Sequence, residues 1–270
     1  MMRLVVPTLL CALLTACASA GSPSINADSS TQAPVVDAAL QAAVEGAWRK
    51  PDNRARDGAR HPLQTLRFFG IAPTHTVVEI TPGAGWYTEI LAPYLRDHGR
   101  YVAAVTNPER TQALLAGDPA RYGKAAVVVF DAKAPVFGPP ASADAVLTFR
   151  NVHNWVGNGT AQDYFDAFHA VLKPGGVLGV VDHRAKPGTA ASTMQKSGYV
   201  TEALVIQMAT RAGFVLEERS DINANPRDDT DHPNGVWTLP PTNRHDPEDA
   251  ASFKAIGESD RMTLRFRKPG

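Results

Sequence analysis

The chain has 270 residues, 44% of them hydrophobic, and its 27 Lys and Arg side chains are balanced by 27 Asp and Glu side chains. This length and composition predict one domain of roughly 200 residues with terminal extensions, and the balanced charge argues against nucleic acid or an anionic membrane surface as the main partner. Both cysteines, Cys11 and Cys17, lie in the opening segment, so the rest of the chain has no disulfide and no thiolate metal site.

The first residues have the pattern of an export signal. Arg3 precedes a short apolar run over 4–14, which is the order found in secretory signal peptides and is too short for a permanent membrane span. We therefore expect a signal peptide over 1–16. Two alternatives stay open: cleavage after Ala20, which would give a soluble periplasmic protein, and a buried N-terminal helix.

A cysteine motif follows the apolar run. Residues 14–17, LTAC, resemble the lipobox of bacterial lipoproteins, and the resemblance implies cleavage before Cys17 and acylation of its thiol. Ala18 after the cysteine implies an anchor in the outer membrane, on its periplasmic face. Residues 17–36 are small and polar with two prolines, which predicts a flexible tether.

An N-terminal helical segment over 37–75 and a main domain over 76–270 follow the tether. The helix signals are apolar spacing, proline at helix starts and glycine at helix ends, and they predict helices over 37–49, 62–70, 85–97, 108–117, 160–176 and 198–213. Apolar runs between them predict strands over 74–81, 100–106, 124–131, 143–149, 177–183, 214–222 and 261–267. This alternation predicts a doubly wound, mostly parallel seven-stranded α/β sheet with helices on both faces, and the charged last strands suit an edge with an antiparallel strand.

The strand-loop-helix unit VVEITPGAGWYTEIL, 77–91, carries a family resemblance together with two later motifs. From about residue 60 onward, the chain resembles class I S-adenosylmethionine-dependent methyltransferases. It shares an acidic residue before a glycine-rich turn, a helix ending in LKPGG at 172–176, and an aspartate after the third strand. The resemblance implies a Rossmann-like fold, S-adenosylmethionine as cofactor, and cofactor contacts from Glu79, Thr81, Gly83, Gly85, Thr106, Asp131 and Arg150.

The sequence departs from the family pattern at the second strand. The family usually places a carboxylate there to bind the ribose hydroxyls, whereas this chain has Thr106. Binding of a nicotinamide dinucleotide is disfavoured for two reasons. Thr88 replaces the third glycine of that fingerprint, and Ala103-Ala104 occupy the place where the fingerprint requires an acidic residue.

Polar residues after the fourth and fifth strands are candidates for catalysis. FRNVHNW, 149–155, and DHR, 182–184, follow strand ends at the expected crevice. His153 or His183 suits a general base, since an unperturbed histidine titrates near neutrality. We expect no metal site; the alternative is a nitrogen and oxygen site formed by His153, Asp182 and His183.

Two further segments are candidates for covering the crevice. The long loop 222–242, with Asp228, Asp229, Asp231 and His232, is either a solvated turn or a lid. The arginines at 54, 56 and 60 would cap the site, pair with this acidic loop or form a solvated face.

The leading interpretation is methyl transfer from S-adenosylmethionine to an unknown small-molecule or envelope acceptor, by a protein held to the membrane through its lipid anchor and without a nucleic-acid partner. The alternative is an exported ligand-binding or envelope-associated protein that has the fold but not the reaction, because fold alone does not give function. A metal-dependent enzyme is the second alternative.

Overall fold

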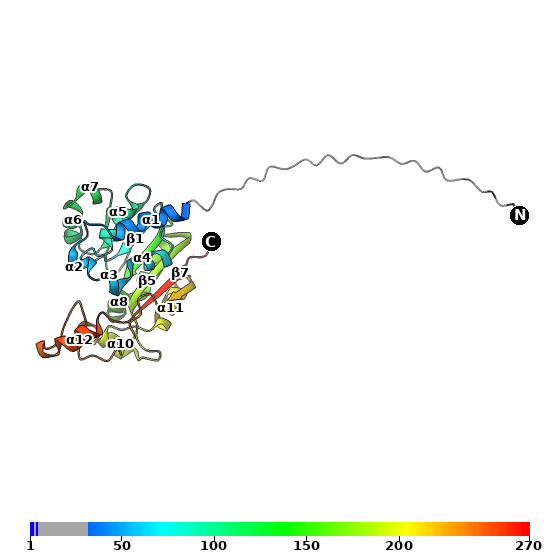
Figure 1. Ribbon diagram of the computed structural model, residues 1–270. Helices are drawn as coiled ribbons and strands as arrows, with labels where there is room; N and C mark the ends of the chain where they lie inside the picture. The colour runs from blue at the N-terminus through cyan, green and yellow to red at the C-terminus, as the bar shows by residue number, and fades with distance from the viewer. Residues whose placement is uncertain (3, 5–31) are drawn as a thin grey trace.

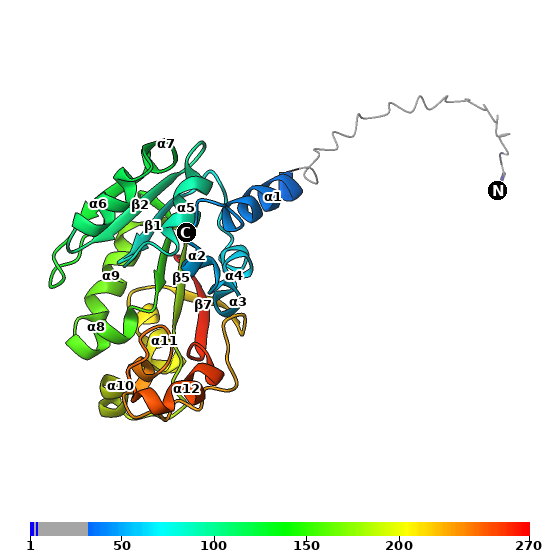
Figure 2. The same ribbon diagram turned by 60° about the vertical axis from the view of Figure 1, so that its left-hand side comes forward.

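The computed structural model describes residues 1, 2, 4 and 32–270. The predicted signal peptide, the predicted lipidation site Cys17 and most of the predicted tether lie outside the described residues. Among the helices that are described, none combines the length and the apolar character needed to cross a bilayer. Figures 1 and 2 show the described domain from two sides, with helices on both faces of its sheet.

Seven strands form the sheet in the order β3-β2-β1-β4-β5-β7-β6. The strands from β3 to β5 in this order pair in parallel, while β7 runs antiparallel to both β5 and β6. The mostly parallel sheet with an antiparallel strand near one edge is therefore confirmed. The strands are β1 (Thr76–Ile80), β2 (Arg100–Val105), β3 (Ala126–Val129), β4 (Ala143–Phe149), β5 (Leu172–His183), β6 (Val215–Ser220) and β7 (Arg261–Arg267).

Helices cover both faces because the central strands are apolar on both sides. In β1, Val78 and Ile80 belong to one core layer and Val77 to the other, and none is more than 2% exposed. The first layer is completed by α9 (Ala161–Val171) and α11 (Glu202–Arg211), and the second by α1 (Gln32–Val44), α4 (Pro62–Phe68) and α5 (Thr88–Leu95). Because both faces of these strands are covered by helices, successive side chains are buried on either side, and the strand sequences are continuously hydrophobic.

The remaining helical elements are short and lie mostly in the connections. They are α2 (Pro51–Arg54), α3 (Asp57–Arg60), α6 (Glu109–Ala116), α7 (Pro119–Tyr122), α8 (Val152–Asn158), α10 (Ala191–Ser197), α12 (Ala250–Ile256) and the 3-10 helices η1 (Gly235–Thr238) and η2 (Pro247–Asp249). The polar stretch 50–60, for which no helix was predicted, forms α2 and α3, and the polar connection before β7 contains η1, η2 and α12.

Several predicted helix boundaries differ from the structure. The first helix spans Gln32–Val44 rather than 37–49, so it begins inside the predicted tether. It ends early because the Arg49 guanidinium donates to the Val44 carbonyl at 2.6 Å and the chain turns at Gly46. The helix predicted over 160–176 ends at Val171, and the LKPGG segment begins strand β5.

Candidate functional site

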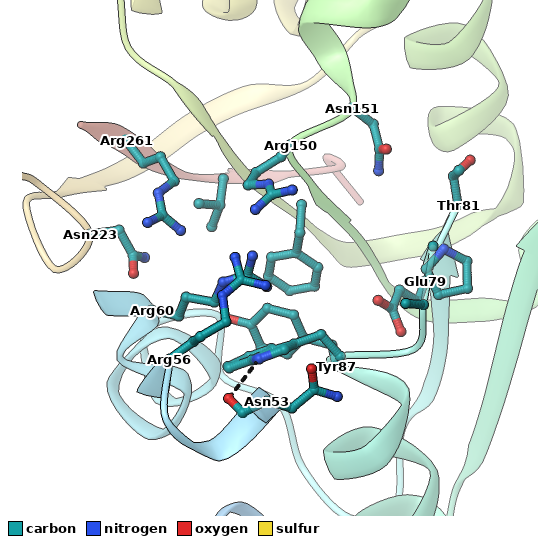
Figure 3. A pocket seen from close by; sticks show the side chains of 16 residues that line it. Asn53, Arg56, Arg60, Glu79, Thr81, Tyr87, Arg150, Asn151, Asn223 and Arg261 are labelled. Atoms are coloured by element: carbon teal, nitrogen blue, oxygen red, sulfur yellow. Dashed lines mark hydrogen bonds between the residues drawn. The ribbon is translucent and has the colours of Figure 1, made fainter. Parts of the chain in front are cut away.

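A cavity of about 200 Å³ opens at the carboxyl ends of β1 and β4. The strand order reverses at β1, because β2 and β3 lie on one side of it and β4 and β5 lie on the other. Ligands of open α/β sheets bind at such a reversal point. The segment with α2 and α3 and the start of β7 complete the wall (Figure 3). The lining residues are Asn53, Arg56, Arg60, Glu79, Thr81, Pro82, Gly83, Ala84, Trp86, Tyr87, Phe149, Arg150, Asn151, Val181, Asn223 and Arg261.

The backbone is left-handed directly after both central strands. Thr81, after β1, has φ +50°, and Arg150, after β4, has φ +62°. Each is held there by a backbone hydrogen bond to a neighbouring strand, Thr81 N to the Ala104 carbonyl and Arg150 N to the Val181 carbonyl. Left-handed backbone at a non-glycine residue costs roughly 1–2 kcal/mol and is concentrated at functional sites. Both residues line the cavity.

Two glycines of the loop after β1 have different roles. Gly83 has φ +62°, and no atom lies within 4 Å of the position that a Cβ would occupy, so its backbone is open to a ligand. Gly85 has φ +83°, but a Cβ there would lie 2.2 Å from Leu114 Cδ2 on α6. Gly83 lines the cavity and Gly85 does not. Gly85 therefore serves the packing of α6, while Gly83 permits close approach to the backbone.

Glu79 is the carboxylate of the cavity, as predicted for the acid before the glycine loop. Its side chain is 3% exposed and accepts hydrogen bonds from Tyr101 Oη at 2.6 Å and Thr88 Oγ1 at 3.4 Å. Burial raises the pKa of Glu79 to about 7, although these two hydrogen bonds lower it. A buried carboxylate of this kind is stabilised in its charged form by a cationic ligand.

Four arginines also line the cavity, and they come from three parts of the chain. Arg56 and Arg60 belong to the N-terminal segment, Arg150 follows β4, and Arg261 begins β7. Arg56 and Arg60 do cover the crevice, but they pair with Glu258 and not with the aspartates of loop 222–242. Figure 3 shows the guanidinium groups gathered on one side of the cavity, with Glu79 and Thr81 across from them.

The structure brings the predicted catalytic histidines together. His153 lies on α8, and His183 follows Asp182 at the end of β5. His153 Nδ1 lies 2.9 Å from Asp182 Oδ1, and the two imidazole rings are 4.9 Å apart. His183 Nδ1 lies 2.5 Å from Ser259 Oγ. Burial, followed by repulsion from His153, lowers the pKa of His183 well below its usual value. Both rings are buried beside the cavity wall, and neither is among the residues lining this cavity.

Candidate ligand atoms of His153, Asp182 and His183 lie within 4.8 Å of one another, as the metal alternative requires. The carboxylate of Asp182 is, however, already engaged. Its Oδ2 accepts from Val152 N at 2.6 Å, and its Oδ1 accepts from His183 N at 2.7 Å and faces His153 Nδ1. A metal ion at this carboxylate would have to displace these bonds. The arrangement instead resembles an aspartate that orients a histidine.

Two other predicted cofactor contacts do not reach the cavity. Thr106 follows β2 and Asp131 follows β3, so both lie at the correct edge of the sheet, but both are exposed and neither lines the cavity. Asp131 Oδ1 accepts from the backbone N–H of Lys133 at 2.9 Å, which is a local turn contact. The structure therefore supports a ligand at the ends of β1 and β4 more directly than at the ends of β2 and β3.

The loop 222–242 contributes only Asn223 to the cavity lining. Asp228 is buried, where it accepts from Tyr199 Oη at 2.8 Å and from the backbone N–H of Asp260 at 2.8 Å, and its Oδ1 lies 2.8 Å from His232 Nε2. These bonds fasten the loop to the domain. The loop is therefore packed against the domain through Asp228 and His232, whereas Asp229 and Asp231 are exposed as a solvated turn requires, and none of these aspartates lines the cavity.

Sequence reasoning missed several residues of this site. Asn53, Asn223 and Arg261 line the cavity, and Glu258 holds three of its arginines through ion pairs. The only sequence signal for Arg261 was its position at the first residue of a predicted strand. It became part of the site because β7 enters the sheet antiparallel, which places the start of β7 beside the carboxyl end of β5.

No protein-family model matches the sequence, and no curated protein matches it in sequence either. Solved structures do match the fold. A SAM-dependent methyltransferase from Aquifex aeolicus has a TM-score of 0.56 at 14% identity, with 86% of this chain and 98% of that chain covered. The N-methyltransferase NodS from Bradyrhizobium japonicum has a TM-score of 0.54 at 18% identity, with coverages of 81% and 99%. The cyclase SpnF has a TM-score of 0.56 at 17% identity, with coverages of 87% and 94%.

The fold and the cavity define an α/β domain with a ligand site at the reversal point of a Rossmann-like sheet. The strand order and the structural matches identify this fold as that of the class I S-adenosylmethionine-dependent methyltransferases.

Proposed function

We propose that the protein transfers a methyl group from S-adenosylmethionine to a small-molecule or envelope acceptor. The observation that carries the proposal is the pairing of an open glycine backbone at Gly83 with the buried carboxylate of Glu79 in one cavity. Such a pair fits the methionine end of this cofactor, whose ammonium group needs a carboxylate and whose chain needs close approach to the backbone. The named activities of the Aquifex aeolicus and Bradyrhizobium japonicum proteins agree with this choice.

Each residue has a defined part in the proposed site. Glu79 accepts from the ammonium of the methionine moiety, and the backbone of 81–84 lines the path of its chain. The Asn151 side chain donates to the Ile80 carbonyl at 2.9 Å and thereby holds the ends of β1 and β4 together. The cofactor supplies an electrophilic methyl group, so the protein has to align the acceptor and remove its proton.

His153 is the proposed general base, and Asp182 is the residue that positions it. Asp182 fixes the Nδ1 side of the imidazole, which leaves Nε2 as the atom able to take a proton. The pKa of His183 is lowered by burial, so this ring remains neutral beside His153 and adds no second charge near neutral pH. Because His153 does not line the cavity, we propose that the proton leaves the acceptor's nucleophile and reaches Nε2 of His153 through a bound water.

A second candidate function is ligand binding without methyl transfer. It is favoured by the exposure of Thr106 and Asp131 and by Leu114 packed against Gly85, since these features place the ends of β2 and β3 outside the cavity. The structural match to SpnF, named as a cyclase, shows that this fold is not restricted to proteins named as methyltransferases.

We also propose that the protein is exported and anchored in the cell envelope through an acylated Cys17. The support is the apolar run before LTAC and the polar stretch after it. An exported protein would bind S-adenosylmethionine either outside the cytoplasm or before its export.

Transfer of tritium from methyl-labelled S-adenosylmethionine to an envelope extract tests the proposed reaction. The wild-type protein should label an extractable compound, and Gly83→Val should not, because a side chain at φ +62° would project into the space where the ligand approaches. Equal labelling by the two proteins, or none by either, would contradict the proposal. Circular dichroism of the variant checks that its fold is retained.

A further inference from the structure

The arginine side of the cavity carries more positive charge than its protein partners neutralise. Glu258 pairs with three of the arginines: Arg56 Nε at 2.6 Å, Arg60 Nε at 3.2 Å and Arg261 Nη2 at 2.7 Å. Both oxygens of the one carboxylate are used by these contacts. Arg150 is a fourth guanidinium at the same cavity, and no hydrogen bond or ion pair joins its side chain to another described residue, although the charges of Glu258 and Asp182 partly offset the burial that lowers its pKa.

One guanidinium donor at the cavity is left without a partner where burial makes this costly. Arg56 Nη2 is fully buried and has no hydrogen-bond partner among the described residues. Burial and the charge of Arg150 lower the pKa of Arg60 to about 9, and burial and the charge of Arg261 lower the pKa of Arg150 to about 10. Four guanidinium groups around the single carboxylate of Glu258 leave an excess of positive charge on this wall of the cavity, which an anion would offset.

Contacts within the protein also fix part of this arginine group. The Arg60 guanidinium lies 4.8 Å from the centre of the Trp86 ring, which is a cation-π contact. Trp86 is fixed in turn, because its Nε1 donates to the Asn53 carbonyl at 2.9 Å. An arrangement of guanidinium groups fixed in this way is suited to bind an anion with little loss of side-chain entropy.

We infer that Arg56, Arg60 and Arg150 bind the carboxylate or phosphate group of the small-molecule acceptor. A planar guanidinium donates two parallel hydrogen bonds to such an oxyanion, which a spherical ion such as chloride cannot match. The acceptor would place its anionic group among the arginines and its nucleophile toward Glu79 and Thr81, on the other side of the cavity (Figure 3). This assignment of the acceptor class depends on the proposed methyl transfer.

Calorimetry with inorganic phosphate, at constant ionic strength against sodium chloride, tests the anion site in the purified protein. Saturable phosphate binding is expected, and Arg56→Gln should weaken it at least about tenfold. Arg54→Gln is the matched control, because Arg54 is exposed in the same segment, loses the same charge and does not line the cavity. Arg150→Lys keeps the charge but not the fork, and a several-fold loss is expected; this variant decides the question if Arg56→Gln does not fold.

Parallel titrations with S-adenosylhomocysteine and with methylthioadenosine, which lacks the methionine carboxylate, separate the acceptor from the cofactor. We expect Arg56→Gln to change neither affinity by more than about twofold. No phosphate binding beyond that of chloride, or equal losses in Arg56→Gln and Arg54→Gln, would overturn the inference. So would a loss for S-adenosylhomocysteine alone, because the arginines would then hold the cofactor's own carboxylate. Phosphate binding without any binding of S-adenosylhomocysteine would preserve the anion site and refute the proposed reaction.

Discussion

Replacement of Glu79 by glutamine should raise the free energy of unfolding near pH 8 and at the same time weaken the binding of S-adenosylhomocysteine. Glu79 is 3% exposed, and burial raises its pKa from 4.5 to about 7. The folded state therefore holds a proton that the unfolded state releases between these two pH values. It follows that the stability contributed by the protonated group is fully present below pH 4.5 and is lost as the pH rises to about 7.

The expected size of this effect follows from the two pKa values. A difference between 4.5 and about 7 corresponds to about 3 kcal/mol of unfolding free energy lost across that interval. Glutamine keeps the shape and can still accept from Tyr101 Oη, but it carries no charge to desolvate. Glu79→Gln should thus equal the wild type near pH 4 and exceed it by about 2–3 kcal/mol near pH 8.

Urea unfolding of both proteins at several pH values between about 4 and 8 measures this difference, since contributions of other titrating groups cancel between them. The same variant should bind S-adenosylhomocysteine roughly 10- to 150-fold more weakly, because it lacks the charged acceptor for the ammonium group. A variant that is less stable than the wild type at high pH, or a stability difference that does not change with pH, would refute the reasoning about Glu79.

Three substitutions and one titration test other parts of the structure and of the proposed function. Gly85→Ala should lower the unfolding free energy by about 2 kcal/mol more than Gly83→Ala in urea unfolding, because only the first Cβ meets Leu114 Cδ2; equal losses would argue against that packing. His183 should remain uncharged at pH 6.5 in an NMR titration, because burial lowers its pKa, and a midpoint at or above this value would contradict its position in the structure. His153→Gln should lower the rate of methyl transfer about 10²- to 10⁴-fold with little change in cofactor affinity, and an unchanged rate would exclude it as the base. Cys17→Ser should move the protein from the detergent phase to the aqueous phase on partitioning, and unchanged partitioning would rule out the lipid anchor.

The order of the seven strands and of the longer helices was predictable from the sequence because each strand carries its own apolar signal, whereas short helices such as α8 and α10 were not predicted. The runs around Val77 and Val146 are continuous, as doubly covered strands require, and the glycine and proline residues between elements end them cleanly. The family resemblance that pointed to Glu79 and Gly83 also rests on a local pattern, since a strand, an acid and a glycine turn are adjacent in the chain. Both residues line the cavity.

Other parts of the site depended on contacts between distant segments, which no local pattern encodes. Arg56 and Glu258 are paired although they stand 202 positions apart in the chain, and Arg261 joins them only because β7 is antiparallel. Thr106 and Asp131 show the opposite case, since they occupy the expected strand ends but remain exposed outside the cavity. Their places at the strand ends were predictable, whereas their exposure depends on how the surrounding segments pack.

Calorimetric titration of the purified protein with S-adenosylhomocysteine tests whether the cavity binds the proposed cofactor. We expect one binding site per chain, weakened by Glu79→Gln and abolished by Gly83→Val. Absence of detectable binding at millimolar ligand, or binding that both variants leave unchanged, would contradict it.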